Sequence, residues 1–389
     1  MTFSQRLPDD FYSGTLDLVR AEMSAQGLSA LLLDDPLDVA YLTGFHHFPN
    51  ERPVACWLPI DDDPVLLVPD LEREYAADQG VRAEIHAYPE FPGAVPPFAV
   101  LAGHVRVPGT AAYAPSTSVA RATALAEAFP ATRWSAGDAV GRTRLRKRPE
   151  EIVLHEEAAR IADEMIAAGV ELVRSAVEGG GELPTENELA AHVIAHGSRL
   201  MYARHEDVVV VPMLTGGLVY GGPNSAQPHR LPGGDRLKAG ETFMLSLGCA
   251  VGGRFVESER TFVIGEPTSR QARYYEVVRE AQEVGTEALV PGTTCEEANR
   301  RCLAVIEAAG FGEHLRHRQG HGIGLGFHEP PWLSDGDPTE LAPGMILSSE
   351  PGVYVPGHAG YRISDTVLVT ETGPRRLTAY PRELTDVII

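Results

Sequence analysis

The chain has 389 residues, enough for two domains, and 43% of them are apolar, which excludes a disordered polypeptide. It carries 54 acidic against 33 basic residues, and the formal net charge of −21 disfavours nucleic acid and membrane surfaces as partners. Its four cysteines show no metal-binding or secretory spacing, and no apolar run resembles a signal or membrane-spanning segment. We therefore expect a cytoplasmic protein.

Alternating helical and strand patterns occupy the first 145 residues. Residues 9–27 have the periodicity of an amphipathic helix that ends at a glycine, and the apolar run 29–36 predicts a buried strand. Two further apolar runs, 53–60 and 64–70, are separated by three aspartates and predict a β-hairpin. The alternation predicts an α/β domain over residues 1–145.

A charged, proline-containing joint at 144–151 marks the domain boundary. A long helical pattern begins there and runs over 149–177, followed by a glycine-rich loop. Thr185 and Glu188 have the spacing of a capping box, which predicts the start of a second helix over 186–203.

The same order of elements then recurs. Strands and turns over 206–265 are followed by a predicted helix over 268–289, and Thr294 with Glu297 predicts the capping box of another. Glycine- and proline-rich strands continue to the end of the chain. Two helices and then strands, twice over, predict a second domain at 146–389 with pseudo-two-fold symmetry and its site between the halves.

Histidines and carboxylates gather in this second domain. His229 lies in a polar loop bracketed by prolines, and His321 and His328 lie in a glycine-rich stretch. Glu257 and Glu259 alternate on a predicted strand, so both carboxylates face the same side. Each feature also has a structural explanation. His229 could be a loop histidine bonded to backbone, Glu257 and Glu259 a solvated strand face, and the glycine-rich stretch a tight turn.

Three more polar side chains come from later strands. Glu350 follows one predicted strand, and Arg362 and Ser364 belong to the next. Side chains from four separate strands that point into one cleft are the constellation that a hydrolase needs.

Four segments together resemble the pita-bread hydrolases, the family of prolidase, X-Pro aminopeptidase and creatinase. These segments are HGIGLGFHEPP at 321–331, SSEPGVYVPG at 348–357, GYR at 360–362 and PH at 228–229. YLTGF at 41–45 and the RKRPEE joint resemble the family's N-terminal domain and linker. The resemblance covers nearly the whole chain and implies a pita-bread catalytic domain after a smaller creatinase-type α/β domain.

The family's peptidases bind two divalent metals through two Asp, one His and two Glu. By resemblance these positions fall on Ser246, Glu257, His321, Glu350 and Ser364. A neutral serine hydroxyl supplies no charge to a hard cation, so two metals would lack two anionic ligands. The sequence therefore argues against a dinuclear site.

The same departures resemble creatinase, the metal-free member, which also has a Ser-Leu strand and a Glu before Arg-Thr. This resemblance implies His229 as the general acid/base. Independently of the resemblance, a histidine without a metal must take the proton from water and return it to the departing nitrogen, and His328 can assist either step. The resemblance implies that Glu259 and Glu350 hold a cationic group of the substrate. It also implies a homodimer in which Arg52 of the N-terminal domain reaches the neighbouring site.

At two positions the sequence differs from the creatinase pattern, and these differences argue against creatine itself as the substrate. Trp332 or a neighbour stands where creatinase has a carboxylate-binding arginine, and Ser364 stands where it has a further histidine. The HEPP motif at 328–331 instead resembles the X-Pro peptidases. The remaining residues expected to bind substrate are His321, Glu257, Arg362, Ser246, Ser364 and Trp332.

Three hypotheses follow. The preferred one is a creatinase-like, metal-independent hydrolase without a cofactor, acting on a C–N bond of a small amidine, guanidine or amide. The first alternative is an X-Pro dipeptidase- or aminopeptidase-like enzyme that retains a single metal on Glu257, His321 and Glu350, since three ligands and an open position suffice for catalytic zinc. The second alternative is a pita-bread binding module without catalysis.

Overall fold

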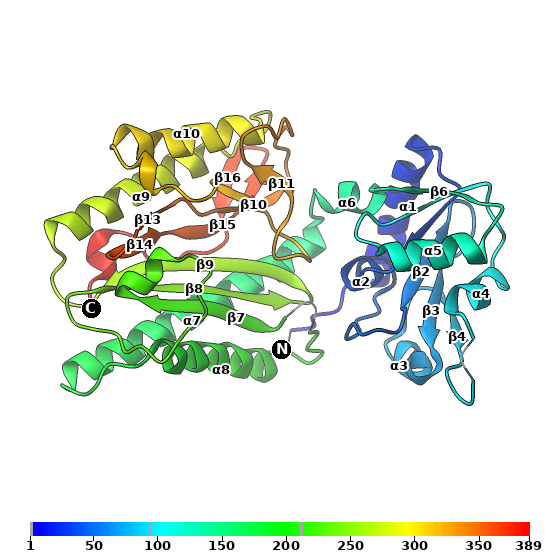
Figure 1. The fold of residues 1–389 in the computed structure, drawn as a ribbon, viewed down its shortest axis with the longest axis horizontal. Helices are drawn as coiled ribbons and strands as arrows, with labels where there is room; N and C mark the ends of the chain where they lie inside the picture. Colours follow the sequence, from blue (N-terminus) through cyan, green and yellow to red (C-terminus); the bar gives the residue numbers. More distant parts are fainter. Residues whose placement is uncertain (1–2, 94, 211–212) are drawn as a thin grey trace. The chain divides into compact units, whose positions relative to one another are not determined.

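The computed structural model describes residues 3–93, 95–210 and 213–389. The chain divides into two compact units (Figure 1). The smaller is Arg6–Arg144, and the larger is Leu145–Ile389 with the first residues up to Gln5. Among the described residues, none of the helices combines the length and apolar character that crossing a membrane requires.

The smaller unit is built on a six-stranded mixed sheet with the order β4-β3-β2-β1-β5-β6. Its strands are β1 (Ala30–Leu33), β2 (Ala55–Pro59), β3 (Val65–Pro69), β4 (Glu84–Tyr88), β5 (Thr110–Tyr113) and β6 (Arg133–Ala136). Its helices are α1 (Asp9–Ala25), α2 (Pro36–Thr43), α3 (Arg73–Asp78), α4 (Pro97–Ala102), α5 (Val119–Ala128) and α6 (Ala139–Arg144). β2 and β3 pair antiparallel, which confirms the predicted hairpin. Trp57 stacks on Phe129 with ring centroids 5.4 Å apart in the core of this unit.

The larger unit contains an eight-stranded sheet with the order β11-β10-β12-β15-β9-β8-β7, to which β16 adds beside β15. Its helices are α7 (Pro149–Glu178), α8 (Glu186–Arg204), α9 (Ser269–Glu287) and α10 (Cys295–Ala308). The strands of its first half are β7 (Thr215–Gly221), β8 (Thr242–Val251) and β9 (Arg254–Val263). Those of its second half are β10 (Gly320–Gly322), β11 (Glu329–Leu333), β12 (Ile346–Ser349), β13 (Gly352–Val355), β14 (Ala359–Arg362), β15 (Ser364–Thr370) and β16 (Gly373–Arg376).

The predicted repeat of two helices followed by strands is present in this unit (Figure 1). α7 and α8 pack along β7, β8 and β9, whereas α9 packs against strands of the second half and against α10. β9 of the first half pairs with β15 of the second, so the two halves share the eight-stranded sheet, whereas β13 and β14 form a separate two-stranded sheet.

Helix starts follow the predicted capping only in part. At α8 the Thr185 hydroxyl accepts from the Glu188 amide and the Glu188 carboxylate accepts from the Thr185 amide, which confirms this capping box. At α10 the Thr294 hydroxyl accepts from the Glu297 amide, but the Glu297 carboxylate pairs with Arg301 at 2.7 Å instead of returning to Thr294. The second predicted box is therefore only half formed, because an arginine one turn along the helix takes the carboxylate.

The register of three central strands sets one row of polar side chains on a single face. Ser246 of β8 lies opposite Glu259 of β9, and Ser364 of β15 lies opposite Glu259 on its other side. Directly opposed residues on neighbouring strands point to the same face of a sheet, and so does Glu257, two residues before Glu259. Four polar side chains are thereby brought together by strand pairing alone.

Candidate active site

Glu257, His321 and Glu350 converge in the larger unit from three different elements. Glu257 lies on β9, His321 on β10, and Glu350 directly after β12. His321 Nε2 lies 3.2 Å from Glu350 Oε1 and 3.8 Å from Glu257 Oε2. One ligand atom from each residue lies within 4.8 Å of the other two, a spacing at which a single ion could touch all three.

The neighbours of these side chains fix their orientation. His321 Nδ1 lies 3.0 Å from the carbonyl oxygen of Gly322, and the His321 amide donates to Ser348 Oγ at 3.0 Å. A carbonyl can only accept, so Nδ1 carries a proton, and Nε2 is the ring nitrogen that faces the carboxylates. Glu257 Oε1 accepts from Ser364 Oγ at 2.7 Å.

His321 Nε2 provides the test of whether the site suits a metal. This buried atom makes no well-directed hydrogen bond within the described residues, although it faces Glu257 and Glu350. A ring nitrogen that faces two carboxylates is stabilised either by its own proton or by a cation bound between the three groups, and a divalent ion can replace the proton. The Nδ1–H bond to a backbone carbonyl is also the contact that metal-ligating histidines usually make. The three residues fit one divalent ion.

The three side chains perturb one another's pKa. Burial lowers the pKa of His321, but contact with Glu350 and the charge of Glu257 raise it more, to about 9. Burial raises the pKa of Glu350, but contact with His321 overcomes this and lowers it to about 2. Burial and the charge of Glu350 raise the pKa of Glu257 to about 8. Near neutral pH these pKa values leave Glu350 ionised beside a charged His321, with Glu257 protonated, so the three groups together are close to neutral.

A second buried cluster contains Ser246, Glu259, Arg362 and Tyr354. Arg362 pairs with both carboxylate oxygens of Glu259, at 2.9 Å between Nη2 and Oε1 and more closely through Nε. The same guanidinium donates to Ser246 Oγ at 3.0 Å and to the Tyr354 hydroxyl at 3.2 Å. Ser246 donates in turn to Glu259. Burial raises the pKa of Glu259, while Glu259 holds that of Arg362 well above its usual value against the effect of burial.

Two of the five positions that would have to bind a pair of metal ions are serines whose hydroxyls already donate hydrogen bonds to carboxylates. Ser246 donates to Glu259, and Ser364 donates to Glu257. Neither hydroxyl brings negative charge, and each already serves a carboxylate. The residues present fit one ion and do not fit two.

A cavity of about 370 Å³ opens beside both clusters. Its polar lining residues are Ser246, Glu257, Glu259 and His328. Its apolar lining residues include Met213, Leu218, Leu247, Phe255 and Phe327. The rings of Phe255 and Phe327 meet edge to face at 4.7 Å. The volume is within the range of small-ligand sites.

The apolar side of the cavity was absent from the sequence prediction. Phe255 could have been found, because it alternates with Glu257 and Glu259 along β9 and so shares their face. Met213, Leu218 and Phe327 come from other elements or turns, and nothing in their local sequence sets them apart from core residues.

The other predicted site residues differ in how near they lie to this cavity. The His328 ring packs 3.8 Å from the His321 ring, and burial, with the His321 charge, lowers its pKa to about 4. His229 is exposed, and Trp332 pairs with His321 across β10 and β11 with its ring 4.6 Å from the Arg318 guanidinium. Neither belongs to the described lining. Arg52, in the smaller unit, pairs with Glu51 and Glu90.

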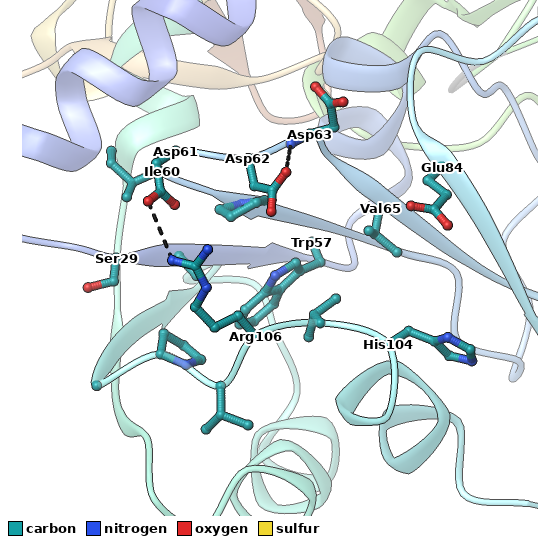
Figure 2. A pocket seen from close by; sticks show the side chains of 16 residues that line it. Ser29, Trp57, Ile60, Asp61, Asp62, Asp63, Val65, Glu84, His104 and Arg106 are labelled. Carbon is teal, nitrogen blue, oxygen red and sulfur yellow. Dashed lines mark hydrogen bonds and ion pairs between the residues drawn. The ribbon is translucent and has the colours of Figure 1, made fainter.

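A second cavity, of about 410 Å³, is lined entirely by the smaller unit. Figure 2 shows Trp57 at its floor and the aspartate turn of the β2–β3 hairpin at its rim, where Arg106 pairs with Asp61 at 3.6 Å. Its lining includes none of the predicted site residues.

The chain belongs to metallopeptidase family M24, whose pattern matches residues 153–371, and residues 16–147 match the creatinase/prolidase N-terminal domain. It is 33% identical over 388 residues to a probable dipeptidase PepE of Mycobacterium tuberculosis, covering 98% of both chains. It is 32% identical over 359 residues to an Xaa-Pro dipeptidase of Lactobacillus helveticus, covering 90% of this chain and 93% of the relative.

Solved structures agree with these relatives. The dipeptidase PepE of Mycobacterium ulcerans superimposes with a TM-score of 0.83 at 28% identity, over 99% of this chain and 100% of the other. The prolidase of Pyrococcus horikoshii gives 0.82 at 26% identity, over 95% and 99%. The predicted family and fold class are confirmed, as is the enzyme class, a hydrolase acting on C–N bonds.

The preferred hypothesis, a creatinase-like and metal-independent hydrolase, is wrong. The relatives are dipeptidases and Xaa-Pro dipeptidases within a metallopeptidase family. The sequence reasoning gave most weight to the two lost ligands at Ser246 and Ser364. Their loss argues against two ions, but Glu257, His321 and Glu350 still meet, and three ligands suffice for one.

Proposed function

We propose that this protein is a dipeptidase of the Xaa-Pro type that holds one divalent ion on Glu257, His321 and Glu350. The observation that carries the proposal is the convergence of these three buried side chains beside a cavity of about 370 Å³. The dipeptidases and Xaa-Pro dipeptidases among its relatives support the substrate class.

Each of the three residues has a distinct part in holding the ion. Glu257 and Glu350 supply anionic oxygens, and His321 supplies Nε2, with its ring oriented by the Nδ1–H bond to the Gly322 carbonyl. A bound divalent ion would lower the pKa of a water molecule and polarise the scissile carbonyl. Ser364 keeps the Glu257 carboxylate turned toward the ligand cluster through its 2.7 Å hydrogen bond.

Proton transfer to the departing nitrogen is assigned to a histidine. His328 lines the cavity and packs on His321, and its lowered pKa keeps it neutral near pH 7, so it would first take a proton from the attacking water and then pass it to the departing nitrogen. His229 remains the second candidate for this role. Separate His328→Gln and His229→Gln variants distinguish the two, since the general acid contributes a factor of about 100 to 10,000 in rate.

We also propose a cytoplasmic homodimer in which Arg52 enters the neighbouring site. Four free, buried cysteines support a reducing compartment. Phe48 and Phe91 support an interface near Arg52, because their side chains are 87% and 90% exposed, and Phe91 follows the Glu90 that pairs with Arg52. A Phe48→Asp variant should be monomeric by light scattering, and an unchanged dimer would contradict this placement.

Metal content and peptide hydrolysis, measured on one preparation, test the function. Protein grown with zinc, manganese and cobalt should hold about one equivalent of metal and release proline from Ala-Pro and Leu-Pro. His321→Ala and Glu350→Gln should lose both properties. Arg106→Gln, in the smaller unit, is the matched control and should keep both. Full hydrolysis after chelation, with less than about a tenth of an equivalent of metal left to activate water, would overturn the proposal.

A further inference from the structure

Glu259 is the carboxylate that the proposed metal site does not use. It lies on β9, two residues after Glu257, and lines the same cavity. It is not one of the three side chains whose ligand atoms come within reach of a single ion. A buried anion at the wall of a substrate cavity, outside the ligand set, requires another explanation.

The contacts of Glu259 hold its carboxylate firmly but do not use all of its acceptor positions. Oε1 accepts from Arg362 Nη2 at 2.9 Å and also from the Ser246 hydroxyl, and Oε2 pairs with Arg362 Nε. An ionised carboxylate offers about four lone-pair sites. Two of them are used by the hydrogen bonds to Oε1, whereas Oε2 faces Arg362 Nε without a directed hydrogen bond among the described residues, so acceptor capacity remains for a donor in the cavity.

A dipeptide brings a cation that needs such an acceptor. Its amino terminus is an ammonium, and an ammonium taken out of water is costly unless it is paired and hydrogen-bonded. Glu257 and Glu350 are committed to the metal in the proposed function. Of the carboxylates that line the described cavity, Glu259 is the one that remains for the substrate.

We propose that Glu259 binds the α-ammonium of the substrate's first residue, and that Arg362 is the positioning residue that holds this carboxylate. The inference rests on the proposed dipeptidase function and deepens it. It makes a free amino terminus a requirement for substrates, so the enzyme discriminates dipeptides from N-blocked and des-amino analogues. The cationic group that Glu259 receives is then the α-ammonium of a peptide.

The neutral partner Ser246 is consistent with this role. Ser246 and Arg362 both donate to Glu259, and together they give the cluster one negative and one positive charge. A second carboxylate at Ser246 would compete for the Arg362 guanidinium. The serine therefore leaves the guanidinium to fix a single carboxylate, with the geometric precision of a two-pronged pair.

The decisive measurement compares Leu-Pro with 4-methylpentanoyl-proline, the same molecule without its amino group. Wild-type enzyme should favour Leu-Pro by about 30-fold or more in kcat/KM, the effect of losing one partner of a buried charge pair. Glu259→Gln should lose most of this preference through a higher KM for Leu-Pro, with 4-methylpentanoyl-proline hydrolysed as before. Metal binding by calorimetry should stay at about one equivalent, because Glu259 is not a ligand.

Two further variants separate recognition from folding. Glu259→Gln leaves the Arg362 guanidinium buried without its carboxylate, so the double variant Glu259→Gln with Arg362→Met removes both charges and should show the same loss of preference. Arg362→Lys keeps the charge but not the two-pronged geometry. It should raise KM for Leu-Pro while leaving kcat and the des-amino substrate unchanged.

Each outcome decides one of the two proposals. If wild-type enzyme hydrolyses Leu-Pro and the double variant keeps the full preference for the free amine, Glu259 does not bind the ammonium and the dipeptidase function stands. If wild-type enzyme binds metal but does not hydrolyse Leu-Pro, the proposed function fails and the inference fails with it. Loss of metal from Glu259→Gln would make Glu259 a ligand and overturn the assignment.

Discussion

Replacing Lys147 with methionine should loosen the turn that carries Phe327 and His328 into the cavity. Lys147 Nζ lies 2.8 Å from Glu329 Oε1, and the Lys147 side chain is only 3% exposed. The other oxygen of Glu329 accepts from the Gly326 amide at 3.2 Å. The ion pair therefore fixes the Glu329 carboxylate, and this carboxylate fixes the backbone at Gly326, directly before Phe327 and His328.

The expected loss of stability is large because the pair is buried. Removing one partner of a buried ion pair costs about 3–5 kcal/mol, against a total stability of about 5–15 kcal/mol for a domain. For a domain of this size, that loss lowers the midpoint of thermal unfolding by roughly 6–20 °C. Displacement of Phe327 and His328 should also lower kcat/KM for Leu-Pro by about tenfold or more at a temperature where the variant is folded.

The chain contains its own matched control. Lys147 and Lys238 are the only lysines in the sequence, and Lys238 is 70% exposed with its ammonium 3.9 Å from Glu241. Lys238→Met should change stability by less than about 1 kcal/mol. Scanning calorimetry and proline release are measured on both variants. A Lys147→Met protein that melts within about 2 °C of wild type and keeps its kcat/KM would refute the role of the pair.

Three further changes test other buried contacts. Asp365→Asn should destabilise the protein by about 3–5 kcal/mol in urea, because the carboxylate pairs at 2.8 Å with Arg260 and both side chains are fully buried; a loss below about 1 kcal/mol would contradict this. Thr185→Ala should cost about 1 kcal/mol by removing the cap of α8, and Thr372→Ala, in the exposed turn between β15 and β16, serves as its comparison. Burial, with the charges of Lys147 and Arg254, lowers the pKa of His155 to about 3, so below about pH 6.5 the unfolded state binds the extra proton and stability falls as the pH falls. His155→Gln should therefore lose about 2 kcal/mol less than wild type between pH 7 and pH 5, and parallel urea curves for the two proteins would show that His155 is not responsible.

Local patterns in the sequence were enough to predict the secondary structure that surrounds the site. The aspartates of 61–63 separate two apolar runs and do turn a hairpin, and Thr185 with Glu188 does cap a helix. Glu257 and Glu259, predicted to alternate on one strand, do share a face of β9 and line the same cavity. These predictions succeed because turns, caps and strand faces depend on neighbours in the chain.

The number of metal ions could not be read from sequence in the same way. Ser246 and Ser364 indicate lost ligands, and the sequence alone led to the wrong preference for a metal-free enzyme. The remaining side chains, Glu257, His321 and Glu350, belong to strands far apart in the chain, and only the register of the folded sheet brings their ligand atoms within 4.8 Å.

The sequence by itself determined the family, the two-fold order of helices and strands, and the residue types available for chemistry, since each of these is carried by local pattern or motif. The tertiary structure alone decided which of those residues lie together. It paired Arg362 with Glu259, turned the Ser364 hydroxyl to Glu257, and placed Phe255 and Phe327 on the cavity wall. Such contacts depend on strand register and packing between distant segments, and no local pattern encodes them.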